Sequence, residues 1–374
     1  MQPRYAVEQL RLRESGYVSL AYAARGWYLS NGTSTVAGEA EQKDVSAVID
    51  FLLSQPWHVD PARVAMVGVS YGGGLALLGA GTDDRVRAVC CLSGWTDLTS
   101  AFFWQGSPNV VWMELLLAPG APARLEPGLR EKMDRLIHGD HASLEGFIRE
   151  RSPGLNGALA RAARRGVPIL MSNNFEDQLF LSNDALRFTE TYSGPRKALL
   201  NQGVHASAEL GGLFGLQDTY VWKEVSAWLD MWLLGVQNGA NKTRVTMQLQ
   251  ADGPSGPREV FSDWPNKRVV AQRNYPQPRG WRLYGHLALS PGSNATETLH
   301  FALFPGVSAG LPVVADPFQT YANIPITSAL PVASRRANLV YLLPLPRTRM
   351  CGVPTLSLDV TRAVSMTMGK AGGG

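Results

Sequence analysis

The chain has 374 residues, of which 45% are hydrophobic and 18% charged, and its formal net charge is +4. This supply of apolar side chains suffices for a large core, and the length predicts two domains. The charge balance is typical neither of disordered chains nor of polyanion-binding surfaces, so we expect no nucleic-acid partner.

The cysteines and the N-terminus exclude further classes. Only Cys90, Cys91 and Cys351 occur, and their spacing is that of neither a disulfide framework nor a zinc site. The first residues lack the apolar core of a secretory signal, and no segment approaches the roughly 20 apolar residues of a membrane helix. We therefore expect a cytoplasmic protein with no metal, no organic cofactor and no membrane partner.

Up to residue 238 short apolar runs alternate with helical segments. This alternation predicts an α/β domain with a mostly parallel sheet and helices on both faces. Apolar residues recur at helical spacing in residues 44–53 and 221–234. The expected strands are residues 17–22, 64–67, 86–92, 167–171 and 197–201.

Two regions depart from this rhythm. Residues 97–152 carry aromatic residues, a Pro/Gly-rich loop and a charged helical run at 128–138, and they read as a helical cap inserted into the domain. From residue 239 to 374 the helical period fades, which predicts a β-sandwich domain resembling a jelly roll. Its expected strands include residues 245–249, 298–302, 338–343 and 355–360.

The clearest chemical motif is the GxSxG pattern of residues 68–72, which follows an apolar strand and precedes a helical run. That context is typical of a nucleophile elbow, in which a sharp strand-to-helix turn lifts a serine above the sheet. Ser70 is the candidate nucleophile. The backbone N–H of Tyr71, at the start of the helix, is a candidate oxyanion donor.

A serine hydroxyl needs a general base, and that base needs an orienting acid. In chains with a nucleophile elbow of this kind, the acid and then the histidine follow the serine in the sequence. His205 follows the expected strand 197–201 and is the candidate base, whereas His286 and His300 fall in the expected β domain. The loop after strand 167–171 contains Glu176 and Asp177, and the residues alone separate these two carboxylates poorly.

Longer stretches resemble the X-prolyl dipeptidyl-peptidase and cocaine-esterase family of serine hydrolases. They are GYVSLAYAARGWYLSNG, with its Arg25-Gly26 turn, WHVDPARVAMVGVSYGG, and GVPILMSNNFEDQLF, which is preceded by an Arg-Ser-Pro at 151–153. This resemblance favours Asp177 over Glu176. It also implies an α/β-hydrolase fold with a jelly roll, but it does not separate peptidase from esterase members.

The chain departs from the family pattern at both ends, which look truncated. It begins just before the strand expected at 17–22, so the tyrosine whose hydroxyl completes the family's oxyanion hole is missing, and the jelly roll stops early. One such donor contributes about 10²- to 10³-fold in turnover. A catalytically silent relative or fragment that acts by binding therefore remains an alternative to an active hydrolase.

The resemblance implies hydrolysis of a peptide or ester bond through an acyl-enzyme on Ser70. The leading expectation is an X-Pro dipeptidyl-peptidase-like activity, and the alternative is an acyl esterase or amidase of the cocaine-esterase type. The partner is a peptide or small-molecule substrate, and the jelly roll would permit a homo-oligomer. Aromatic candidates for the substrate pocket are Tyr28, Trp95, Phe103, Trp104 and Trp112.

Overall fold

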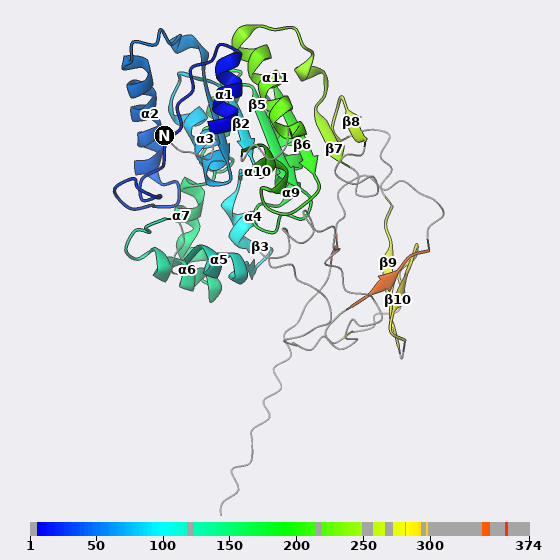
Figure 1. Ribbon diagram of the computed structural model, residues 1–374. Coiled ribbons are helices and arrows are strands. Elements are labelled where there is room, and N and C mark those ends of the chain that lie inside the picture. The colour runs from blue at the N-terminus through cyan, green and yellow to red at the C-terminus, as the bar shows by residue number, and fades with distance from the viewer. Residues whose placement is uncertain are drawn as a thin grey trace, which may run out of the picture.

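The computed structural model describes residues 6–117, 123–213, 219–248, 257–265, 272–280, 282–292, 297, 339–344 and 356–357. Its centre is a six-stranded sheet in the order β1-β2-β5-β6-β7-β8, parallel except for the last pair (Figure 1). The strands are β1 (Val64–Val69), β2 (Val86–Leu92), β5 (Ile169–Asn174), β6 (Arg196–Asn201), β7 (Val245–Gln248) and β8 (Arg258–Phe261). This is the expected α/β architecture.

Helices cover both faces of the sheet because each face is a continuous apolar surface. One face packs on α2 (Glu39–Ser54), α3 (Tyr71–Thr82), α8 (Ala158–Arg164) and α9 (Ser182–Thr191). The other packs on α10 (Ser207–Leu213) and α11 (Tyr220–Leu234), with α1 (Ala6–Glu14) beside them. Figure 1 shows these two helical layers with the strands between them.

The segment between β2 and β5 forms the expected helical cap. It contains α4 (Leu98–Phe102), the hairpin β3 (Phe103–Trp104) and β4 (Ser107–Pro108), then α5 (Val110–Leu117), α6 (Leu129–Ile137), a 3₁₀ turn (Ala142–Leu144) and α7 (Glu145–Glu150). These helices bury an apolar cluster of their own that is continuous with one side of α3. In Figure 1 they gather at one end of the sheet.

One expected strand is absent. Residues 17–22 have no strand pairing, although Tyr17 packs on the α11 side of the core and its hydroxyl donates to Asp230 at 2.9 Å. A strand requires a hydrogen-bonded neighbour, and β1 pairs with β2 alone among the described residues. Val18 and Leu20 of this segment are correspondingly exposed.

The boundary expected after residue 238 needs a correction. β7 and β8 lie beyond it, yet they pair with β6 and with each other and so continue the sheet of the first domain. Farther along, β9 (Tyr275–Gln277), β10 (Gly285–Ala288) and β11 (Tyr341–Leu342) form a separate small sheet. The strands expected at 298–302 and, for the most part, at 355–360 lie outside the described residues, so the jelly roll remains a proposal.

Candidate active site

Ser70 occupies the sharp turn between β1 and α3. Its backbone angles are φ 55° and ψ −114°, a strained conformation for a residue with a side chain. The turn is held because the Ser70 N–H donates to the carbonyl of Leu92 at 2.8 Å. A Cβ on Gly68 would lie 2.2 Å from the backbone carbonyl carbon of Gly72, so the close approach of strand and helix requires glycine. The elbow predicted from GxSxG is present.

The structure brings Ser70, His205 and Asp177 together from three strand ends. His205 Nε2 lies 2.8 Å from Ser70 Oγ, and His205 Nδ1 lies 2.8 Å from Asp177 Oδ2. Ser70 follows β1, Asp177 follows β5 and His205 follows β6, so the carboxyl ends of parallel strands deliver all three. The His205 tautomer that is consistent with these two contacts has Nδ1–H donating to the carboxylate and Nε2 accepting from the serine hydroxyl.

Asp177 and Glu176 are separated by the geometry of their loop. The Asp177 side chain is fully buried, and its Oδ1 accepts the backbone N–H groups of Leu179 and Phe180, each at 2.9 Å. Glu176 is exposed, and its backbone N–H donates to the carbonyl of Gly203 in the histidine loop at 3.0 Å. The carboxylate that faces His205 is therefore that of Asp177.

Two aromatic rings hold the imidazole from the sides. Trp112 of α5 and Phe180 meet His205 edge-on, with ring centroids 5.6 and 5.4 Å away. Trp112 was an expected pocket residue, whereas Phe180 was missed. The sequence signal for Phe180 is its position three residues after Asp177, at the end of a loop that must fold back over the Asp177 carboxylate.

The other expected pocket residues lie elsewhere. Trp95 is buried beneath α3, and its indole N–H donates to the carbonyl of Arg151 at 2.8 Å, so it is a core residue. Phe103 stacks on His141, and the ring of Trp104 is covered by the guanidinium of Arg187. Tyr28 is half-exposed and contacts Trp27.

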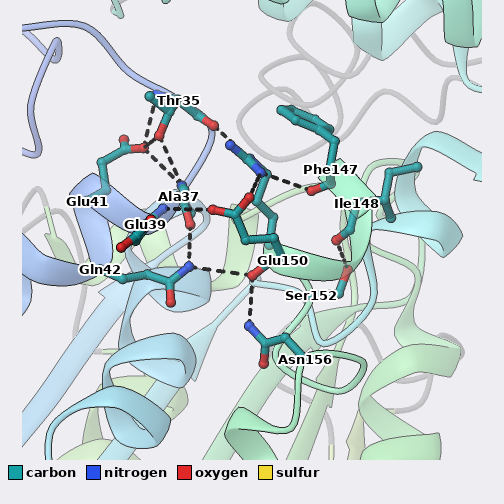
Figure 2. A network of polar contacts seen from close by, with 12 residues as sticks. Thr35, Ala37, Glu39, Glu41, Gln42, Phe147, Ile148, Glu150, Ser152 and Asn156 are labelled. Carbon is teal, nitrogen blue, oxygen red and sulfur yellow. Dashed lines mark hydrogen bonds and ion pairs between the residues drawn. The ribbon is translucent and has the colours of Figure 1, made fainter. Parts of the chain in front are cut away.

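Tyr71, whose N–H is the candidate oxyanion donor, is fixed through its side chain. Its hydroxyl contacts Glu41 Oε1 and Ser34 Oγ and accepts the Ala37 N–H. Burial is the main cause that raises the pKa of this phenol, so it stays protonated. The buried Glu41 carboxylate also accepts the N–H and hydroxyl of Thr35 at 3.0 and 2.6 Å (Figure 2).

The same loop ties the cap to the core. Figure 2 shows the start of α2 beside the end of α7: the Glu39 N–H donates to the Glu150 carboxylate at 2.9 Å. Arg151 is buried, donates to the Thr35 carbonyl at 2.8 Å and lies over the Phe147 ring. Helix α7 of the cap is therefore anchored to the loop whose residues bind the Tyr71 hydroxyl.

No group of three His, Cys, Asp or Glu side chains in the described ranges could hold a metal ion. Among the described helices, none combines the length and the apolar character that crossing a bilayer requires.

A family model described as X-Pro dipeptidyl-peptidase (S15 family) matches residues 2–207, more than half of the chain. The chain belongs to this X-Pro dipeptidyl-peptidase family. The matched region ends just after His205, so it contains the elbow, the acid loop and the histidine loop.

Two solved structures are similar to this X-Pro dipeptidyl-peptidase family member. A CocE/NonD family hydrolase from Staphylococcus aureus is 14% identical with a TM-score of 0.50, and the match covers 68% of this chain and 43% of that one. An esterase from Pyrococcus furiosus is 16% identical with a TM-score of 0.42, over 62% of this chain and 77% of that one. The first similarity shows the α/β-hydrolase fold. The search of curated proteins returned no match.

Proposed function

We propose that this protein is a serine hydrolase that cleaves a peptide or ester bond through an acyl-enzyme on Ser70. The observation that carries the proposal is the unbroken hydrogen-bond chain from Asp177 through His205 to Ser70 Oγ, with both links at 2.8 Å. Membership of a hydrolase family supports it. Because the chain spans 43% of the length of the S. aureus hydrolase, the activity is argued from this chain's own residues.

In the first half-reaction Ser70 Oγ attacks the substrate carbonyl while its proton passes to His205 Nε2. The charge that develops on the carbonyl oxygen meets the Tyr71 N–H and the N-terminus of α3. Asp177 stabilises the imidazolium and keeps its tautomer. His205 then gives its proton to the leaving amine or alcohol, and the acyl group remains bonded to Ser70.

In the second half-reaction water replaces the leaving group. His205 takes a proton from the water, the resulting oxygen nucleophile attacks the acyl carbonyl, and the proton returns to Ser70 Oγ as the acid product leaves. The Trp112 and Phe180 rings against His205 limit the access of bulk water to the imidazole.

For the substrate, family membership favours peptides from which a dipeptide ending in proline is released. Short acyl esters are the second candidate, because the rings of Trp112 and Phe180 beside His205 offer an apolar contact surface for an acyl group. A dipeptidyl-peptidase also needs an acidic group for the free amine of its substrate. The buried carboxylate of Glu41 is already engaged by Tyr71 and Thr35, so it does not serve that role.

The proposal is tested by labelling the purified protein with a fluorophosphonate and mapping the adduct by mass spectrometry. We expect an adduct on Ser70 that is lost in Ser70→Ala and strongly reduced in His205→Ala, since only an activated serine reacts. A panel of X-Pro anilides and short acyl esters then separates the two substrate classes. A folded protein that stays unlabelled would contradict the proposal and favour a catalytically silent relative.

A further inference from the structure

A second fully buried carboxyl group lies close to the catalytic residues and has no part in the steps above. Glu209 belongs to α10, four residues after His205, and has no exposed surface. It interacts electrostatically with His205. A buried carboxylate is costly unless hydrogen bonds compensate its charge, so its partners are informative.

Glu209 binds the end of the strand that leads to Asp177. Ser172 Oγ donates to its Oε1 at 2.6 Å, and Asn174 Nδ2 donates to its Oε2 at 3.0 Å. Both partners belong to β5, and Asn174 is the last residue of that strand. Asn174 is also the acceptor of the Asp177 N–H at 3.1 Å, through its backbone carbonyl.

The same cluster reaches the end of β2, which lies beside the Ser70 turn, and the end of β6, which leads to His205. Asn174 Nδ2 also donates to Ser93 Oγ at 2.9 Å, and Ser93 directly follows Leu92, whose carbonyl holds the Ser70 N–H. Asn201, the last residue of β6, donates through Nδ2 to Ser172 Oγ at 3.0 Å. One buried carboxyl thus connects the ends of β2, β5 and β6.

The hydrogen bonds of this cluster form a continuous network. Ser172 Oγ accepts from Asn201 and donates to Glu209. Ser93 and Asn174 are donors as well. Burial raises the pKa of Glu209, while these three hydrogen bonds and His205 act in the opposite direction. The neighbouring Cys91 thiol is neutral because burial raises its pKa.

We infer that Glu209 is a positioning residue of the active site: its buried carboxyl aligns the ends of β2, β5 and β6, and with them the loops that carry Asp177 and His205. The described contacts of His205 itself are with Asp177, Ser70, Trp112 and Phe180. Glu209 therefore acts on the site through the strand ends and not through a hydrogen bond to the imidazole. The inference rests on the proposed function of His205 as general base.

The test compares Glu209→Gln, which keeps the shape but replaces one carboxyl oxygen with an amide nitrogen, with a matched control. Asp184→Asn makes the same change at another buried carboxyl, which lies on α9 and accepts from the N–H and hydroxyl of Thr96 at 2.8 and 2.6 Å. Glu209→Asp, which retains the carboxyl group, serves as the rescue variant. Two readouts are measured: the free energy of unfolding in urea and the rate at which fluorophosphonate labels Ser70.

We expect Glu209→Gln to lower the rate of Ser70 labelling by about tenfold, because the amide nitrogen cannot accept the hydrogen bond that the carboxyl oxygen accepts and the strand ends lose their alignment. Asp184→Asn should leave the labelling rate unchanged, and Glu209→Asp should restore most of the lost rate.

An unchanged labelling rate in folded Glu209→Gln, or an equal loss in Asp184→Asn, would overturn the inference while leaving the proposed hydrolase intact. Folded wild-type protein that resists labelling would instead contradict the proposed function. Should Glu209→Gln fail to fold, Ser172→Ala provides the second variant. It removes the hydroxyl that links Glu209 to Asn201 and should also slow labelling, and an unchanged rate there also overturns the inference.

Discussion

At the scale of single residues, the site depends on which of two adjacent carboxylates faces the imidazole. Asp177 is buried and receives two backbone N–H groups on one oxygen, which leaves the other oxygen for His205. Glu176 points to solvent. A loop position one residue away thus changes a catalytic candidate into a surface residue, because side chains of neighbouring residues leave the backbone in different directions.

This arrangement gives a residue-scale prediction. In Asp177→Asn the amide oxygen can still accept hydrogen bonds from the two backbone N–H groups, so the amide nitrogen faces His205 Nδ1. Because that nitrogen is a donor, Nδ1 must be the acceptor and the ring hydrogen moves to Nε2. In this tautomer Nε2 cannot accept the serine proton. We expect kcat to fall by about 10⁴-fold with little change in stability. Glu176→Gln is the matched control and should retain full turnover. Steady-state kinetics on the substrate found in the panel measures both, and equal activity of the two variants would refute the assignment of the acid.

At the scale of elements, the elbow is a contact between a strand and a helix that leaves no space for side chains. β1 and α3 approach so closely that a Cβ on Gly68 would overlap backbone atoms of Gly72, which cannot yield as a flexible side chain can. Gly74 likewise lies against the ring of Trp95. The glycine pattern of residues 68–74 is therefore a packing requirement as well as a motif.

Gly68→Ala should consequently destabilise the protein by about 3 kcal/mol or more and abolish labelling of Ser70. Gly146→Ala, in the helix α7, adds a Cβ where no atom lies within 4 Å, and it should be neutral or stabilise by up to about 1 kcal/mol. Urea unfolding of both variants provides the comparison. Equal stabilities would show that the elbow is looser than its geometry indicates.

At the scale of the whole molecule, buried ion pairs link stability to pH. Asp83 ends α3, and its nearly buried carboxylate accepts from Arg85 Nε at 2.9 Å and from Arg85 Nη2 at 2.6 Å. Arg85 also bonds to Asp50 and the carbonyl of Ser46 on α2, so the cluster joins two helices. These bonds with Arg85 are the main cause that holds the pKa of Asp83 well below its usual range.

Because the folded pKa is depressed, the native state binds fewer protons than the unfolded state as the pH falls. The stabilisation is complete above the usual carboxyl range, near pH 4, and is lost as the pH falls further. Asp83→Asn should therefore cost about 2 kcal/mol at pH 7 and progressively less below pH 4. Glu145→Gln, which removes an exposed pair with Arg149, should cost less than about 0.5 kcal/mol. A pH-independent loss in Asp83→Asn, measured by urea unfolding, would contradict this account.

The sequence alone determined the α/β class, the elbow around Ser70 and the helical cap, because hydrophobic periodicity and the spacing of glycines are local properties of the chain. It also narrowed the candidate acid to two adjacent residues, of which the family resemblance favours Asp177, and the candidate base to His205. The apolar run at residues 17–22 predicts a strand, but these residues have no strand pairing. The sequence also predicts that the strand β5 ends at Met171, whereas it continues through the polar residues Ser172, Asn173 and Asn174.

Only the tertiary structure decided the remaining points, since each depends on contacts between distant segments. Burial and two backbone N–H groups distinguish Asp177 from Glu176, packing places Phe180 and Trp112 on the imidazole, and pairing with β6 joins β7 to the first domain's sheet. Glu209 shows the same limit: an acidic residue in a helix gives no sign in the sequence that its carboxyl will bind the end of β5 and, through it, join the hydrogen bonds of β2 and β6.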